Sequence, residues 1–173
     1  MPVSPNVKNY HIGKGVVSWK PTGGSFADLG NAPLFQYAPT VTKLEHFSAR
    51  EGVKTKDFSA ITQISATITI HLDEITAQNL ALFALSDADL TTAGSVTMGG
   101  LTKAEFPGTI KVVGTNDIGQ QIDFTGDCTL IPQGNFSFIT SEDTFSILEI
   151  QAEIQKDAAG NFGIWTVRDT TTA

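Results

Sequence analysis

Apolar and polar residues alternate along three segments of the chain, and this alternation predicts β-strands. A period of two over such lengths is typical of a strand with one buried face. In residues 60–74 the apolar face holds Ile64, Ala66, Ile68, Ile70 and Leu72, against Ser65, Thr67, Thr69, His71 and Asp73. In residues 120–132 it holds Ile122, Phe124, Cys128 and Leu130, against Asp123, Thr125, Asp127 and Thr129. In residues 145–157 it holds Leu148, Ile150, Ala152 and Ile154, against Glu149, Gln151, Glu153 and Gln155.

Shorter apolar runs predict the remaining strands. We expect them at 15–20, 34–47, 109–115, 136–140 and 162–169, with Pro39 placing part of the second at a sheet edge or a bulge. The last strand is expected to pair back on 145–157 through the glycine-containing turn at 158–161, as a C-terminal hairpin.

Residues 75–87 carry the pattern of a helix. Thr76 is placed to cap its N-terminus, and Asp73 and Glu74 lie where the helix dipole favours negative charge. The expected apolar stripe consists of Leu80, Phe83 and Ala84, widened by Leu82 and Leu85. A helix of about three turns needs a sheet to pack against.

These elements predict a mainly β fold, an antiparallel β-sandwich or small barrel with one flanking α-helix. We expect a single domain over 1–173, with an N-terminal arm at 1–9 and a short C-terminal arm at 169–173. The glycine-rich stretches 21–33 and 88–108 are expected to be loops.

The segment between the second and third predicted strands is unusually long and basic. Residues 48–59 carry Arg50, Lys54 and Lys56 in a chain whose net charge is −7. A linker of this length exceeds what a tight hairpin needs, so we expect a functional loop.

Composition and motifs argue against an enzyme. An acidic chain is poorly suited to gripping nucleic acid, and the lone cysteine, Cys128, fits a buried core thiol. His11, His46 and His71 are scattered without metal-ligand spacing, and neither a phosphate-binding loop nor a nucleophile elbow occurs. Glu149 and Glu153 would lie about 13 Å apart along one strand, too far to share a reaction centre. We therefore expect no cofactor, no signal peptide and no membrane helix.

Three phrases in residues 10–85 resemble the major tail tube proteins of long-tailed, siphovirus-like bacteriophages. YHIGKGVVSWKP (10–21) is similar to the family's opening strand. FADLGNAPLFQYAPTVTKLEHFSAREGVKTKD (26–57) is similar to its DLGN phrase, its KLEHFS strand end and its basic hairpin tip. ITIHLDEITAQNLALFAL (68–85) is similar to its strand leading into the helix. The likeness covers nearly half the chain, and residues 88–173 share only a strand-rich character.

The resemblance implies a structural role in the virion. It implies a barrel or sandwich with a long hairpin and a flanking helix. Six copies would form a ring, and rings would stack into a hollow tube that conducts DNA to the host during ejection. The implied partners are other copies of the chain, the tape-measure protein, and the tail terminator and tail tip proteins, with assembly in the host cytoplasm.

Several expectations concern assembly. Arg50, Lys54 and Lys56 are expected to meet acidic groups of a neighbouring ring or subunit, and the two arms to contact neighbours. Asp123, Asp127, Glu149 and Glu153 are candidates for lining the lumen, where negative charge would repel DNA phosphates; an outer surface fits them nearly as well.

Two other readings remain open. One is another virion ring protein, such as a tail terminator or head–tail completion protein, that forms single rings. The other is a non-enzymatic β-sandwich binding module, for which Trp19, Trp165, Tyr10 and Tyr37 would be the aromatic contacts.

Overall fold

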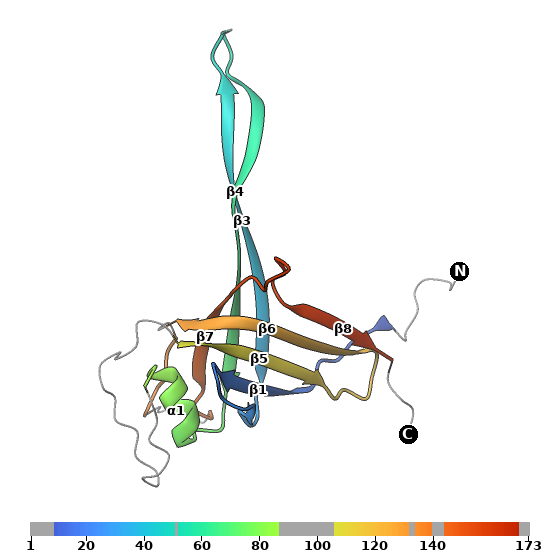
Figure 1. The fold of residues 1–173 in the computed structure, drawn as a ribbon, viewed down its shortest axis with the longest axis vertical. Helices are drawn as coiled ribbons and strands as arrows, with labels where there is room; N and C mark the ends of the chain where they lie inside the picture. Colours follow the sequence, from blue (N-terminus) through green and yellow to red (C-terminus); the bar gives the residue numbers. More distant parts are fainter. Residues whose placement is uncertain (1–8, 51, 87–105, 132–133, 140–143, 170–173) are drawn as a thin grey trace.

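The computed structural model describes residues 9–50, 52–86, 106–131, 134–139 and 144–169. Their elements are β1 (Gly15–Pro21), β2 (Ala27–Asp28), β3 (Leu34–Ser48), β4 (Thr55–Leu72), α1 (Ala77–Phe83), β5 (Phe106–Gly114), β6 (Gln121–Ile131), β7 (Leu148–Ile154) and β8 (Ile164–Arg168) (Figure 1). The predicted loop at 88–108 and the two arms lie almost wholly outside these residues.

The strands form one antiparallel sheet. Their order is β2-β1-β5-β6-β7-β4-β3, and β8 pairs with β6 beside this path. The mainly β, antiparallel class expected from the alternation is confirmed.

The sheet curls over so that strands far apart in its order face one another. Phe35 and Tyr37 on β3 contact Phe124 on β6, with ring centroids 6.0 and 5.7 Å apart. Tyr37 also meets Trp165 on β8 edge to face at 5.3 Å. The apolar face of the sheet therefore encloses the core, in the manner of a barrel whose two end strands do not pair.

The buried positions match the predicted alternation in the body of the molecule. The fully enclosed side chains include Ile68, Ile70 and Leu72 of β4, Phe124 and Cys128 of β6, and Leu148, Ile150 and Ile154 of β7. Ile64 is an exception, since it is about half exposed although it was expected on the buried face. It lies where β4 leaves the body.

The helix is shorter than predicted but is capped as expected. Thr76 is the N-cap, and its hydroxyl accepts a hydrogen bond from the Asn79 amide at 3.1 Å. Leu82 and Leu85 are buried, whereas Leu80 and Phe83 of the expected stripe are only partly buried. The helix packs on β7 at one end of the sheet (Figure 1).

Asp73 and Glu74 form hydrogen bonds to the loop before β3, in place of the expected interaction with the helix dipole. Glu74 accepts a hydrogen bond from the Asn31 amide at 2.9 Å, and Asp73 accepts one from the Asn31 side chain at 2.6 Å. These bonds fix the chain before β3 against the end of β4. The buried Asn79 side chain donates to the carbonyl oxygens of Leu29 and Glu74, which ties the helix to the same corner.

Two strand predictions are wrong. Residues 162–169 do not return to β7: β8 pairs with Gln121–Thr125 of β6, while β7 pairs with Cys128–Ile131 of the same strand. The two strands share one edge of the longer β6, so the turn between them redirects the chain instead of closing a hairpin. In the segment 136–140, the described residues contribute only an isolated bridge between Phe136 and Leu148.

Candidate assembly surfaces

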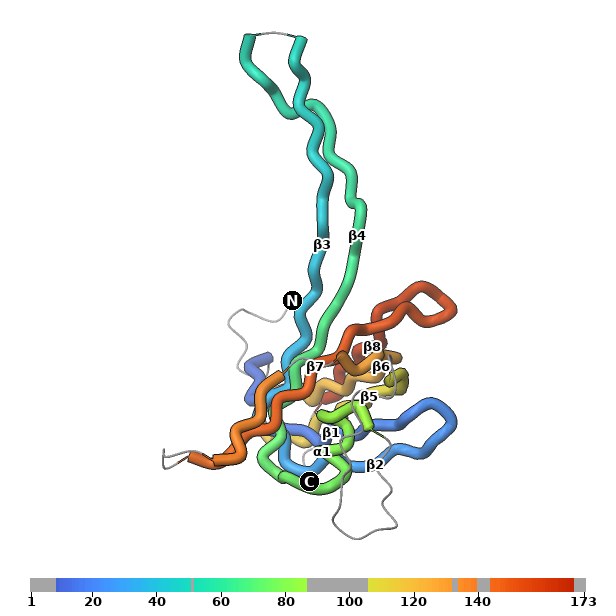
Figure 2. The backbone as a smooth tube through the Cα atoms, turned by 90° about the vertical axis from the view of Figure 1, so that its left-hand side faces the viewer, coloured from blue at the N-terminus to red at the C-terminus, as the bar shows by residue number. Residues whose placement is uncertain are grey.

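The most prominent feature of the molecule is the β3–β4 hairpin. The two strands pair continuously from Leu34↔His71 to Ser48↔Thr55. Their lower halves belong to the body, and their upper halves stand away from it as a two-stranded ribbon (Figures 1 and 2). The seven steps from Val41 to Ser48, at about 3.4 Å each, give this ribbon a length of about 24 Å. Residues 48–59, expected to be a loop, are therefore strand in only half of their length: Ser48 ends β3, residues 55–59 belong to β4, and the tip with Arg50 and Lys54 lies between them.

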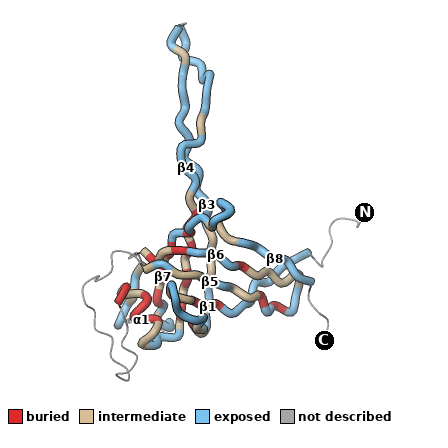
Figure 3. Tube along the Cα trace, in the orientation of Figure 1, coloured by how far each residue is buried: buried red, intermediate tan, exposed pale blue. Residues whose placement is uncertain are grey.

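Most residues of the ribbon are exposed (Figure 3), and its large apolar side chains lie on both of its faces. The pairing register places Val41 opposite Ile64 and Lys43 opposite Ile61 on the face continuous with the core. The other face carries Leu44 opposite Ala60 and His46 opposite Phe58. Leu44 is 66% exposed and Phe58 is 63% exposed. A ribbon in water normally turns polar residues outward, so this one has the composition of a surface that another molecule covers.

Two β-bulges divide the ribbon. The register shifts between Thr42 and Lys43 and again between His46 and Phe47, leaving Thr62 and Asp57 of β4 without a paired residue. Asp57 accepts a hydrogen bond from the His46 ring at 2.6 Å. Bulges increase strand twist and interrupt a flat edge, which protects an exposed ribbon from unspecific strand pairing.

The three cations predicted to act together differ in their surroundings. Lys56 forms an ion pair with Glu45 across the ribbon. Arg50 and Lys54 are exposed at the tip and have no ion pair within the described residues. Residues 41–64 hold four Lys or Arg and three Asp or Glu, a net charge of +1, which leaves −8 for the rest of the chain.

The four candidate carboxylates share the outward face of the sheet, opposite the core. Asp127 and Glu153 are exposed, while Asp123 and Glu149 are half-buried. Asp127 accepts a hydrogen bond from the Thr109 hydroxyl at 2.8 Å, and Glu149 accepts one from the Gln151 side chain at 2.8 Å.

Asp123 is the most strongly held of the four. Both its oxygens accept from the Arg168 guanidinium at 2.7 Å, and one also accepts from the Gly114 amide at 2.9 Å. The hydrogen bonds from Arg168 lower the pKa of Asp123, and the same pair raises the pKa of Arg168. A carboxylate neutralised in this way contributes little repulsion toward phosphate.

The outward face carries both signs of charge. The register places Lys20 of β1 opposite Thr109, which in turn lies opposite Asp127, and it places Lys111 of β5 opposite Thr125, one row along on the same face. Both ammonium groups lie over the Phe26 ring, at 5.2 and 5.8 Å from its centroid. The face is thus polar and mixed, and less acidic than the strand sequences of β6 and β7 alone suggest.

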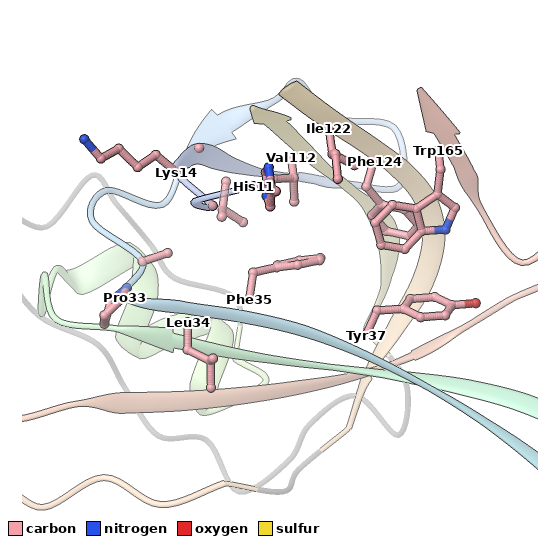
Figure 4. Close-up of a pocket in the computed structure, with 14 residues that line it drawn as sticks. His11, Lys14, Pro33, Leu34, Phe35, Tyr37, Val112, Ile122, Phe124 and Trp165 are labelled. Carbon is pink, nitrogen blue, oxygen red and sulfur yellow. The ribbon is translucent and has the colours of Figure 1, made fainter. Parts of the chain in front are cut away.

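An apolar cleft opens where the curled sheet fails to close. It has a volume of about 320 Å³ and lies between β3 and the opposite layer of β1, β5, β6 and β8. Figure 4 shows Phe35 and Tyr37 projecting from β3 toward Val112, Phe124 and Trp165. His11 and Lys14 lie at its rim, where the His11 Nδ1 is 2.9 Å from the Gln120 carbonyl oxygen.

Groups suited to chemistry do not converge in the described part of the chain. No set of three or more His, Cys, Asp or Glu side chains there is placed to hold a metal ion. Cys128 is buried, as expected, and burial raises its thiol pKa to about 12. The helix in these residues is too short to cross a membrane.

Comparison with protein families gives one match across most of the chain. Residues 10–162 match the family described as Protein of unknown function UCP028589. The chain belongs to this family. A search of the curated proteins found no match.

Among solved structures, the chain is similar to one described as "Tail of empty GTA particle computed with helical refinement, C6 symmetry". The two are 12% identical, with a TM-score of 0.44, over 91% of this chain and 96% of that one. A likeness at this level decides nothing about function, which has to be argued from the surfaces of this chain.

The sequence contains a signal for the uncovered ribbon that strand periodicity does not capture. Between residues 41 and 64 the large apolar residues fall on both phases of the alternation. The sequence did not indicate that Trp165 would join the cleft or that Arg168 would pair with Asp123. Both residues lie on β8, which was expected to pair with β7 and instead pairs with β6.

Proposed function

We propose that this chain is a structural subunit of a phage tail tube, in which hexameric rings stack into a hollow conduit for DNA. The observation that carries the proposal is the β3–β4 ribbon. It exposes Leu44, Phe47, Phe58 and Ile61 on two faces, and the body of its own subunit covers neither face.

The energetics favour contact with another subunit. Burying one large apolar side chain contributes about 1.5–3 kcal/mol, so several of them along a rigid ribbon supply a substantial part of an interface. A rigid ribbon also loses less conformational entropy on association than a disordered loop of the same length. The resemblance of residues 10–85 to tail tube proteins supports the same role.

Mixed polar faces fit the wall of such a conduit. In this proposal the outward sheet face, with Asp127, Glu149 and Glu153, lines the channel, and the paired Asp123 adds little to its potential. Thr, Gln and paired charges offer phosphate no cluster of cations to bind. The position of Glu153 in an assembled tube tests the assignment, since a place on the outer surface would exclude it.

A tube subunit of this kind acts within the virion and needs no catalytic group or cofactor. Its partners would be other copies of itself, the tape-measure protein, and the proteins at the two ends of the tail. A tail terminator would differ by forming single rings that do not stack, and a sugar-binding module would remain a monomer.

Electron microscopy and mass measurement of the purified chain test the proposal. We expect rings or tubes from the natural sequence. Replacing Arg50, Lys54 and Lys56 together with Ala is expected to block tube growth while leaving the β-sheet circular dichroism unchanged. Monomers at every concentration from the natural chain, with or without tail-initiating proteins, would count against a tube subunit; normal tubes from the triple variant would exclude the role of the cations.

A further inference from the structure

The body carries an uncovered apolar surface of its own beside the open cleft. We call it the collar, and define it as Tyr10, Ile12, Ile118, Trp165 and Val167, all of which are exposed. The residues come from three segments that lie together. The chain at Tyr10 and His11 runs against Gly119 and Gln120, and Val167 pairs with Ile122, which lines the cleft.

Acidic side chains border the collar. Asp117 lies in the turn between β5 and β6, next to Ile118; its side chain is 87% exposed, and its one ion pair is a long one to Lys14 at 3.8 Å. Asp169 follows β8 and accepts a hydrogen bond from the Gln120 side chain at 3.3 Å. Both carboxylates remain available to a cation from outside.

The ribbon has the complementary features. It presents apolar side chains along its length and ends in Arg50 and Lys54, which lack acidic partners in the described part of the chain. Its own collar is out of reach, because β3 and β4 continue straight from the body and carry the tip away from it (Figures 1 and 2).

We propose that the β3–β4 ribbon of one copy docks on the collar of a second copy. The shaft of the ribbon covers Trp165, Val167 and the mouth of the cleft, and the tip places Arg50 and Lys54 beside Asp117 and Asp169. The inference rests on the proposed function in that it requires a second copy of this chain, and it names the receptor that the ribbon meets.

A contact of this kind is head to tail, since each copy offers one ribbon and one collar. Such heterologous contacts propagate, closing into rings or continuing as filaments according to the rotation between subunits. The same pair of surfaces therefore joins every copy to the next, and no surface has to be self-complementary.

Engineered cysteines test the contact in the full chain. Val53 at the tip and Ile118 beside Asp117 are both exposed. The double variant Val53→Cys with Ile118→Cys is expected to give, on mild oxidation, a ladder of covalent oligomers spaced by one subunit mass. The buried Cys128 should not interfere, since burial keeps its thiol protonated. Each single variant should give dimers at most.

A matched control pairs Val53→Cys with Thr125→Cys, which is exposed on the outward sheet face away from the collar. This control should give no ladder. Tubes or rings that form from the Val53/Ile118 variant without a ladder, or an equal ladder from the control, would overturn the docking site while leaving the tube proposal standing. Failure of the natural chain to assemble would overturn both.

A charge exchange provides a second measurement that needs no cysteine. Arg50→Glu with Lys54→Glu is expected to abolish assembly, and adding Asp117→Lys is expected to restore it at least in part, because the opposite signs face each other again. Restoration supports the docking site even if the cysteine variants fail to fold. Absence of restoration in a folded variant contradicts it.

Discussion

The strands β3 and β4 run through both the body and the ribbon, yet the burial of their apolar side chains differs between the two regions. On β4, Ile68 and Ile70 are fully buried, whereas Ile61 and Ile64, a few residues earlier on the same strand, are half exposed or more. In the body a second layer covers one face of the strand. In the ribbon neither face is covered, and both carry large apolar side chains among polar ones. An isoleucine in a strand pattern therefore does not always mark a position in the core of its own subunit, and the proposed tube would cover Ile61 and Ile64 with a second copy.

The sharpest way to test this difference is to truncate one phenylalanine in each region. Phe124 is enclosed by Phe35, Tyr37 and Trp165, so Phe124→Ala is expected to lower the free energy of unfolding by about 3–5 kcal/mol. At about 2–4 °C per kcal/mol for a chain of this size, the melting temperature should fall by roughly 10 °C.

The matched variant Phe58→Ala should cost less than about 1 kcal/mol in the separated subunit, because Phe58 is exposed and lies opposite His46 on a two-stranded ribbon. Thermal unfolding of both variants under conditions that prevent assembly provides the measurement. Equal losses of stability would mean that the ribbon is as tightly packed as the body.

A smaller effect is expected from the Asp123–Arg168 pair, which joins β6 to β8 in the body. The pKa of Asp123 is lowered in the folded chain, so the pair stabilises fully above the ordinary carboxyl pKa of about 3.9 and loses this contribution as the pH falls through the lowered value. Asp123→Asn is expected to cost at most about 1 kcal/mol near neutral pH and to reduce the loss of stability on acidification.

Urea unfolding at pH 7 and at pH 3 measures both effects. Asp169→Asn is a suitable control, since Asp169 has only a hydrogen bond from Gln120 and no cation within the described residues. An unchanged acid sensitivity in Asp123→Asn would show that other carboxylates determine it.

The smallest effect on stability is expected where the effect on assembly is largest. Leu44→Ser with Phe58→Ser removes two exposed apolar side chains from one face of the ribbon. The melting temperature of the separated subunit should stay within a few degrees of the natural value, while rings and tubes should disappear in micrographs. Normal assembly from this double variant would show that the exposed face with Leu44 and Phe58 is not an interface.

The alternation of apolar residues predicted the class of fold and most strands because it reflects local geometry that tertiary contacts reinforce. The cap at Thr76 and the buried rows of β6 and β7 were predictable for that reason. The partner of β8 was not, because a strand's period does not record which edge it joins. Two strands share one edge of β6, and only the full path of the chain shows it.

The candidate surfaces were predictable in part. The role expected of the basic segment at 48–59 stays a prediction, and its expected form as a loop holds only for the tip, because cross-strand pairing extends to Ser48 and Thr55. The cations there are not equivalent, since Glu45 neutralises Lys56. Likewise the outward sheet face is less acidic than β6 and β7 alone, because the sheet order places Lys20 of β1, Lys111 of β5 and Arg168 of β8 on it or beside it.

The order of strands in the sheet has a consequence for how the chain folds during synthesis. β3 and β4 are neighbours in sequence and form the ribbon locally, whereas β1 pairs with β5 and β4 pairs with β7, across long stretches of sequence. Loop closure over such separations is slow and comes late. The nascent chain thus displays its apolar ribbon before residue 154 exists to complete the layer beside β4. During that interval the feature that would join finished subunits is also a hazard for premature association.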